Sequence, residues 1–206
     1  MNSGATLERI YGELKRRVLS SVYRPGDRLE PAALAEELGS STTPVRDALH
    51  LLVGEHLLAT RTGGGFFVPQ IDEPALQDLY DWAAQILLLA LRDAGADDEP
   101  GGAVAAGAED DDRTSLTAAL FERIGARSGN AEHLRELRSI NDRLHAARLA
   151  EQSLLEGWRD ELDGIETAFN AGDLPRLRRA ILAYHRRRHR AAAAVVRALY
   201  RLDPIS

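Results

Sequence analysis

The chain has 206 residues, of which 44% are hydrophobic and 28% charged, a composition typical of a soluble protein with one large core or two small ones. It contains no cysteine, which excludes a disulfide framework, a thiolate metal site and a cysteine nucleophile. The net charge of -6 excludes a uniformly basic nucleic-acid-binding coat. Basic and acidic residues are equal in number over residues 1–70, so the negative charge arises entirely in the remainder.

No stretch of the sequence is predicted to cross a membrane or to direct export. The longest apolar run, Ile86–Leu91, is far shorter than the ~20 residues that a bilayer requires. The segment Met1–Arg9 lacks the basic region and the apolar region of a secretory signal. We therefore expect a cytoplasmic protein with no membrane partner.

The first part of the chain begins with three predicted helices. Apolar residues at helical spacing predict the first over Thr6–Ser20, which ends before the turn sequence Arg24–Asp27. A short second helix lies between Pro31 and Gly39, because proline suits a first helical turn and glycine a helix end. A third helix begins near Pro44, where the preceding hydroxyl groups offer a cap, and ends near His56.

A hairpin follows the third helix. Two strand-like runs, Leu57–Arg61 and Phe66–Val68, flank the glycine-rich turn Thr62–Gly65. Three helices and a hairpin in this order are typical of a winged helix-turn-helix, in which the last helix lies in the major groove of DNA. Residues 1–70 are therefore predicted to form a DNA-binding domain.

Four segments of this domain resemble the DNA-binding domain of GntR-family transcription regulators, in order and with family-like spacing. They are Arg24–Leu29, Leu34–Gly39, Ser41–Leu49 and Gly63–Val68. The resemblance covers about residues 8–69. It implies a dimer that binds a palindromic operator in double-stranded DNA, and usually represses until a small-molecule effector releases it.

The start of the predicted recognition helix carries the best candidates for DNA contact. Arg46 can hold a guanine edge or a phosphate through two parallel hydrogen bonds, which a threonine hydroxyl cannot do. The alternative reading is a helix cap beside a surface arginine. The full candidate set for DNA binding is Ser41, Thr42, Thr43, Arg46, Arg61, Gly64, Gly65, Arg9 and Arg28.

Two positions depart from the family pattern. Relatives commonly carry a basic residue in place of Thr42 and an arginine or similar group in place of Gly64. Fewer cationic contacts should weaken binding, because each neutralised phosphate contributes to affinity. Arg9, Arg16, Arg17, Arg28 and Arg61 are candidates to compensate, although each alone reads equally well as a solvated surface charge.

Residues 71–206 are predicted to form an antiparallel helical bundle that binds an effector and dimerises. Apolar spacing predicts one helix from Glu73 to Asp93, and residues 94–113 are too rich in Ala, Gly, Asp and Glu to form a core, so we expect a flexible acidic loop. Four further helices follow, with apolar stripes that begin at Leu116, Leu134, Leu155 and Leu174. The expected fold class is mainly α with a small β-wing.

The bundle resembles the FCD-type effector domain of the FadR subfamily. The resemblance rests on Ser128–Asn130, on Ala171–Asp173, on a late histidine and on the number of helices. It implies a metal site made by one aspartate and three histidines. Three of these positions are occupied here by Thr117, Phe121 and Leu162, and only His185 matches, so we expect no metal and no other cofactor.

These four residues, Thr117, Phe121, Leu162 and His185, are instead the candidate effector-binding residues. His185 with a neighbouring arginine could meet the carboxylate or phosphate of an effector such as an organic acid. The alternative reading of Arg186–Arg190 is the solvent face of an amphipathic helix. His133 and His145 read as part of an ion-paired exterior.

The sequence offers little for catalysis. It contains no glycine-rich phosphate loop, no nucleophile-elbow serine and no paired carboxylates at an apolar site, so we predict no catalytic residue. The predicted function is a DNA-binding transcription regulator, a repressor controlled by an effector in the bundle. The alternative is a regulator-like scaffold that has lost effector sensing and acts through protein contacts. An enzyme that uses His185 is the third hypothesis.

Overall fold

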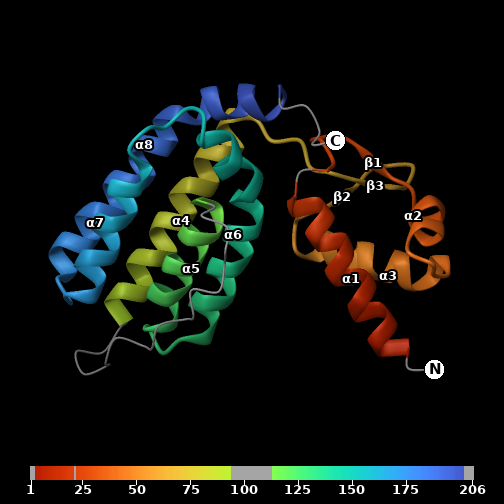
Figure 1. Ribbon diagram of the computed structural model, residues 1–206, viewed down its shortest axis with the longest axis horizontal. Coiled ribbons are helices and arrows are strands. Elements are labelled where there is room, and N and C mark those ends of the chain that lie inside the picture. The colour runs from red at the N-terminus through yellow and green to blue at the C-terminus, as the bar shows by residue number, and fades with distance from the viewer. Residues whose placement is uncertain (1–2, 21, 94–112, 202–206) are drawn as a thin grey trace. The chain divides into compact units, whose positions relative to one another are not determined.

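A computed structural model describes residues 3–20, 22–93 and 113–201 (Figure 1). Within these ranges the chain is mostly helical, with one small antiparallel sheet, which confirms the predicted fold class. The chain divides into two compact units. One contains Ile71 and the described residues before it, together with Leu199–Arg201, and the other spans Asp72–Ala198.

The first unit is built on three helices, α1 (Ser3–Leu19), α2 (Pro31–Glu37) and α3 (Thr42–Gly54). Apolar residues three and four apart place Ile10 and Leu14 of α1 in one fully buried core with Val45, Leu49 and Leu52 of α3. Burial of each such side chain contributes about 1.5–3 kcal/mol. This packing holds α3 against α1 and leaves the opposite face of α3 outside the core.

Three short strands complete the first unit, β1 (Arg28–Leu29), β2 (Ala59–Thr60) and β3 (Phe66–Phe67). They form an antiparallel sheet in the order β1-β3-β2, in which both Arg28 and Ala59 pair with Phe67. The hairpin β2–β3 lies where the two strand-like runs predicted it. The strand β1 was not predicted, because two residues are too few to show the alternation that identifies a strand.

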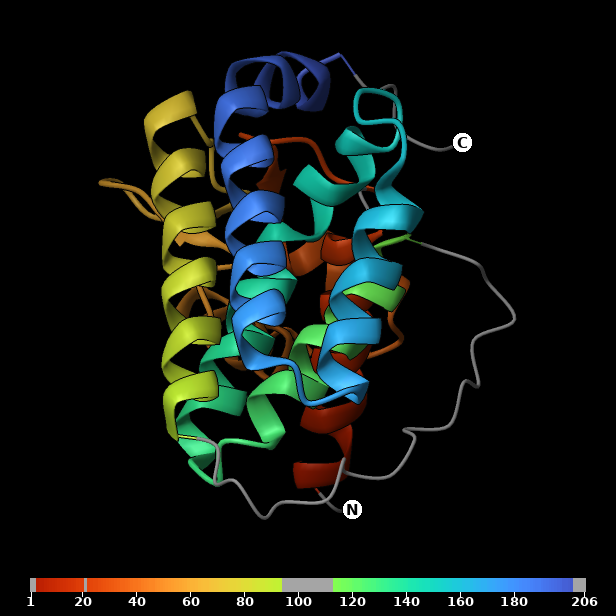
Figure 2. The same cartoon turned by 90° about the vertical axis from the view of Figure 1, so that its left-hand side faces the viewer.

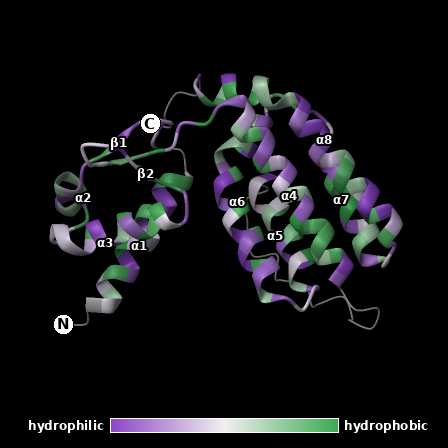
Figure 3. Ribbon diagram, turned by 180° about the vertical axis from the view of Figure 1, so that it is seen from behind, coloured by the Kyte–Doolittle hydropathy of each residue, from purple (hydrophilic) through white to green (hydrophobic). Residues whose placement is uncertain are grey.

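The second unit consists of α4 (Glu73–Asp93), α5 (Arg113–Ala126), α6 (Ala131–Glu151), α7 (Trp158–Asn170) and α8 (Leu174–Leu199). These helices run alongside one another, and each interleaves apolar with polar residues (Figures 2 and 3). Helices α5 and α6 approach closely at Gly125, where an added Cβ would collide with Leu137. Amphipathic helices of this kind bury their apolar stripes against one another and enclose an interior.

Two expectations about α5 require correction. The predicted acidic loop lies outside the described residues except for Arg113, which is the first residue of α5 and is buried. Leu116, expected on the apolar stripe, is 42% exposed, and Thr114 and Thr117 face the interior instead. Among the described residues, no helix is both long and apolar enough to cross a bilayer.

Candidate DNA-binding surface and polar interior of the bundle

The N-terminal end of α3 lies at the surface of the first unit. Ser41 occupies the N-cap position with an extended backbone, and Ser41, Thr42 and Thr43 are all exposed. The predicted side-chain cap is absent, because the Ser41 hydroxyl accepts no hydrogen bond from the helix. The first-turn amides of α3 therefore carry no side-chain cap, and they form the positive end of the helix dipole.

One face of α3 continues this exposed surface. Arg46, Asp47 and His50 are exposed, and Leu51 is 49% exposed, whereas Val45 lies in the core. No residue in the described ranges forms a hydrogen bond or an ion pair with the Arg46 guanidinium. His50 and Leu51 were not predicted as part of this surface, although His50 is four residues after Arg46 and so lies on the same face.

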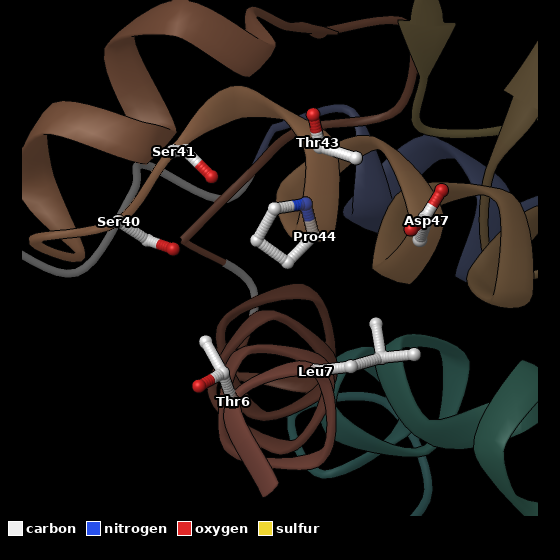
Figure 4. A pocket seen from close by; sticks show the side chains of 7 residues that line it. All are labelled: Thr6, Leu7, Ser40, Ser41, Thr43, Pro44 and Asp47. Carbon is white, nitrogen blue, oxygen red and sulfur yellow. The ribbon is translucent and has the colours of Figure 1, made fainter. Parts of the chain in front are cut away.

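A surface hollow of about 390 Å³ lies between the start of α3 and α1 (Figure 4). Its walls are formed by Thr6, Leu7, Ser40, Ser41, Thr43, Pro44 and Asp47. The Asp47 carboxylate in this wall repels a phosphate group. On this face, Arg46 is therefore the group that attracts a polyanion, and Asp47 opposes it.

Two arginines, one from β1 and one that follows β2, lie around one aromatic ring of the sheet. The Arg61 guanidinium lies 4.3 Å from the centre of the Phe67 ring, and that of Arg28 lies 6.0 Å from it. Gly65 has a φ of +95°, and a Cβ there would lie 3.2 Å from both Arg28 Nε and the Phe67 ring. Gly64 also has a positive φ, of +88°. Only glycine adopts this backbone without strain.

Most other basic groups of this unit already pair with acidic ones. Arg16 and Arg17 both donate to the Glu13 carboxylate, and Arg28 donates to Glu30. Arg9 donates to the backbone carbonyl at the end of α2. Arg46 and Arg61 make no ion pair with any carboxylate in the described part of the chain. Arg46 and Arg61, and Arg9 with its uncharged carbonyl partner, are therefore cations without a described counter-charge.

The interior of the second unit contains three buried arginines, Arg113 of α5, Arg148 of α6 and Arg188 of α8, each 1% exposed. A buried carboxylate, Glu151 of α6, lies among them. Its Oε2 accepts from Arg113 Nη2 at 2.8 Å and from Arg188 Nε at 3.0 Å. Its Oε1 accepts from Tyr80 of α4 at 2.6 Å. One side chain thus joins four helices.

The environment of this cluster shifts several pKa values. Burial, followed by the charge of Glu151, raises the pKa of Tyr80 well above its ordinary value. Burial lowers the pKa of Arg113. Burial also opposes the charge of Arg188, but the neighbouring Tyr184, Glu151 and Glu161 outweigh it and raise its pKa. Both guanidinium groups remain protonated at neutral pH.

His185 of α8 lies beside this cluster, and its side chain is buried. Its ring stacks on Phe121 of α5 with a centroid distance of 5.6 Å, and Nδ1 lies 2.9 Å from the carbonyl oxygen of Ile181. Burial, together with the charges of Arg188 and Arg148, lowers the pKa of His185 to about 3, although the hydrogen bond with Ile181 opposes the shift. The imidazole is therefore neutral and carries its proton on Nδ1.

Comparison with known proteins connects the first unit to one family. Residues 6–68 match the family described as bacterial regulatory proteins, gntR family. The matched segment includes α2, α3 and the hairpin, together with most of α1. This part of the chain is a GntR-family domain.

Individual relatives agree with this assignment. The Nta operon transcriptional regulator of Aminobacter aminovorans is 30% identical over a match covering 61% of this chain and 65% of that protein. The HTH-type transcriptional regulator McbR of Escherichia coli is 33% identical over 40% of this chain and 37% of that protein. The chain thus spans two thirds or less of the curated relatives that it matches.

Solved structures share the fold over most of the chain. A protein from Rhodococcus sp. RHA1, described as a transcriptional regulator GntR, has a TM-score of 0.74 and 15% identity over 92% of this chain and 98% of that one. Escherichia coli McbR/YncC has a TM-score of 0.62 and 18% identity over 92% and 97%. The GntR-family domain and the helical bundle therefore occur together in known folds.

In the helical bundle, the structure brings some of the predicted effector residues together. Phe121 and His185 are in contact, and Thr117 is buried on the same face of α5, where its hydroxyl donates to the Arg113 carbonyl. Leu162 is buried on α7. The interpretation of Arg186–Arg190 as a solvent face is wrong for Arg188, which is buried and pairs with Glu151.

Arg113, Arg148 and Glu151 were not predicted as members of this site. A signal for two of them exists, because the apolar stripe of α6 through Leu144 continues four and seven residues later at Arg148 and Glu151. Polar residues on an apolar stripe indicate a buried polar cluster. Arg113 carries no such signal, since its neighbours before α5 have no periodic pattern.

The bundle does not fit the metal site that the FCD resemblance implies. Thr117, Phe121 and Leu162 offer no imidazole or carboxylate, and His185 stands beside two arginines. Among the described residues, no group of three or more His, Cys, Asp or Glu side chains could hold a metal ion. A single nitrogen ligand next to cationic groups does not retain a divalent cation.

Proposed function

We propose that the chain is a cytoplasmic transcription regulator that binds double-stranded DNA as a homodimer and represses transcription. The observation that carries this proposal is the exposed N-terminal face of α3, with Arg46 unpaired among the described residues, inside a GntR-family domain. Two such helices related by a two-fold axis would read the two halves of a palindromic operator. The names of the relatives support a regulator rather than an enzyme.

The DNA contacts would come from two places in the first unit. Ser41, Thr42, Thr43 and Arg46 would meet bases and phosphates at the start of α3. At the hairpin, Arg61 would contact the backbone beside Gly64 and Gly65, whose lack of side chains permits close approach. Arg9, whose described partner is an uncharged carbonyl, would add long-range attraction, whereas the ion pair with Glu30 leaves Arg28 a smaller contribution.

We infer that the bundle is an FCD-type domain of the FadR subfamily, which controls DNA binding through an effector. The effector would be a small organic acid, bound around His185, Phe121, Thr117 and Leu162. If it prefers one arrangement of the two subunits, it changes operator affinity by its coupling free energy, commonly about 1–3 kcal/mol.

The test measures binding to labelled double-stranded DNA from the region upstream of the chain's own gene by fluorescence anisotropy. We expect Arg46→Ala to weaken binding by about 10- to 100-fold, since a bidentate contact contributes about 1–3 kcal/mol. The control is Arg16→Ala, an exposed arginine of α1 that pairs with Glu13, and it should change the dissociation constant less than twofold.

Two results would contradict the proposal. Equal losses for the two variants would mean that α3 is not the recognition helix. Binding to no palindromic fragment, even at low salt, would instead favour a scaffold that acts through protein contacts. The pairing of Arg16, Arg17 and Arg28 with carboxylates is the observation that favours the scaffold, because it reduces the charge available for DNA.

A further inference from the structure

Among the residues that the structure describes, positive charge exceeds negative charge in the interior of the bundle. Three guanidinium groups, those of Arg113, Arg148 and Arg188, are buried there with the carboxylate of Glu151. The next carboxylate, that of Glu161, is 22% exposed and bonds to Arg188. Arg148 bonds to no carboxylate in the described ranges, and its Nη2 donates to the amide oxygen of Asn141. A buried cation is costly unless an anion compensates it.

The excess positive charge is concentrated in two of the three arginines. Arg188 uses all of its nitrogen atoms, since it donates to Glu151, to Glu161 and to the Tyr184 carbonyl. Arg113 donates through Nη2 alone, and its buried Nε and Nη1 have no partner among the described residues. The buried Nη1 of Arg148 also lacks one. Two guanidinium groups therefore keep free donors inside the bundle.

Further polar atoms without partners surround the same place. Tyr184 Oη and His185 Nε2 are buried and bond to no described residue. Both rings pack on Phe121, at centroid distances of 5.3 and 5.6 Å. The Arg148 guanidinium lies 5.6 Å from the same Phe121 ring. The side chain of Phe121 thus stands among a cation, a hydroxyl and a neutral imidazole, which is a mixture of apolar wall and polar groups that a small ligand requires.

We propose that this interior is a metal-independent binding site for a small carboxylate, in which the guanidinium groups of Arg113 and Arg148 supply the positive charge. A guanidinium presents parallel N–H donors that match the two oxygens of a carboxylate. His185 and Tyr184 would bond to other polar atoms of the ligand, and Phe121 would contact its carbon atoms. The site deepens the proposed function and rests on it for its role in regulation.

The position of the arginines explains how such a site works without the metal of the FCD pattern. A metal ion there would provide a cation for the acid group of a ligand. In this chain, Phe121 stands at one of the metal-ligand positions, and Arg148 lies over its ring. A fixed guanidinium charge therefore lies beside the place where the family pattern would hold the ion.

The experiment titrates the full chain, dialysed against EDTA, with small anions in an isothermal titration calorimeter. The probes are acetate, pyruvate, lactate, malonate, succinate, citrate and inorganic phosphate, with succinamide as the uncharged control. We expect saturable binding of at least one carboxylate, no binding of succinamide, and the same affinity after addition of Zn²⁺, Ni²⁺ or Mn²⁺.

Variants then locate the site. Arg148→Met should weaken binding of the tightest-binding carboxylate at least tenfold. Arg190→Met, which changes an exposed arginine of α8, should leave the affinity for that carboxylate within twofold of the wild-type value. Far-UV circular dichroism checks that each variant is folded. If Arg148→Met does not fold, Arg148→Lys replaces it and should show the same tenfold loss, because an ammonium group cannot donate two parallel bonds.

The inference is overturned if none of the carboxylates binds, if binding requires the added metal, or if the change at Arg148 leaves affinity intact. It is also overturned if phosphate binds more tightly than every carboxylate, which would make the ligand class wrong. DNA binding is measured separately by anisotropy. Carboxylate binding without DNA binding would leave this site standing and remove the proposed function, whereas DNA binding without carboxylate binding would do the reverse.

Discussion

Mild acid should destabilise the bundle, because His185 gains its proton only on leaving the interior. Its ordinary pKa of 6.5 applies to the unfolded chain, and burial lowers the pKa to about 3 in the folded one. Stability due to the neutral ring is therefore complete above about pH 6.5 and is lost as the pH falls toward 3. Between pH 7 and pH 5, the free energy of unfolding should decrease by about 2 kcal/mol from this group.

Tryptophan fluorescence measures this loss directly. The two tryptophans of the chain, Trp82 and Trp158, belong to α4 and α7, so urea unfolding followed by their emission reports on the bundle alone. The wild-type chain, His185→Gln and His189→Gln are compared at pH 7 and pH 5. His189 lies four residues later on α8 with a side chain that is 37% exposed, and it serves as the matched control.

All groups other than these two histidines are the same in the three chains, so their contributions cancel in the comparison. We expect the decrease between pH 7 and pH 5 to be about 2 kcal/mol smaller in His185→Gln than in the wild-type chain. The decrease in His189→Gln should match the wild type. Equal decreases in the wild-type chain and His185→Gln would refute the reasoning, since they would show that the buried ring is not the group responsible.

Three further changes test the packing. Glu151→Gln removes the buried counter-charge and should lower the free energy of unfolding of the bundle by about 3–5 kcal/mol in urea, whereas the exposed Glu132→Gln should have almost no effect. Leu49→Ala should cost about 2–5 kcal/mol in thermal unfolding, and the exposed Leu51→Ala well under 1 kcal/mol. Gly65→Ala should cost about 1–3 kcal/mol, because alanine is strained at its positive φ; an unchanged melting temperature would contradict this.

The arrangement of the GntR-family domain was largely predictable from local sequence. Helical spacing of apolar residues located α1 and α3, and proline and glycine located the ends of α2. The exposed position of Arg46 follows from the same spacing, because Val45 and Leu49 must face the core. Backbone and side-chain preferences that act within a few residues are legible in one sequence.

The pairing of charges on that domain was not predictable. Arg16 and Arg28 are as basic in sequence as Arg46, yet both are bonded to carboxylates. The partner of Arg28 is two residues away, but whether the two side chains meet depends on how β1 is held against β3. Only the three-dimensional arrangement distinguishes a cation that is available to DNA from one that is already neutralised.

The interior of the bundle depended even more on tertiary structure. Helix periodicity located five amphipathic helices and placed Leu162 on a buried stripe, and a resemblance brought Phe121 and His185 into the same group. Glu151 bonds to Arg113, which lies 38 positions before it in the chain, and to Arg188, which lies 37 positions after it. The three residues belong to separate helices. Electrostatic energy depends on distance in space and on the exclusion of water, and a single sequence records neither.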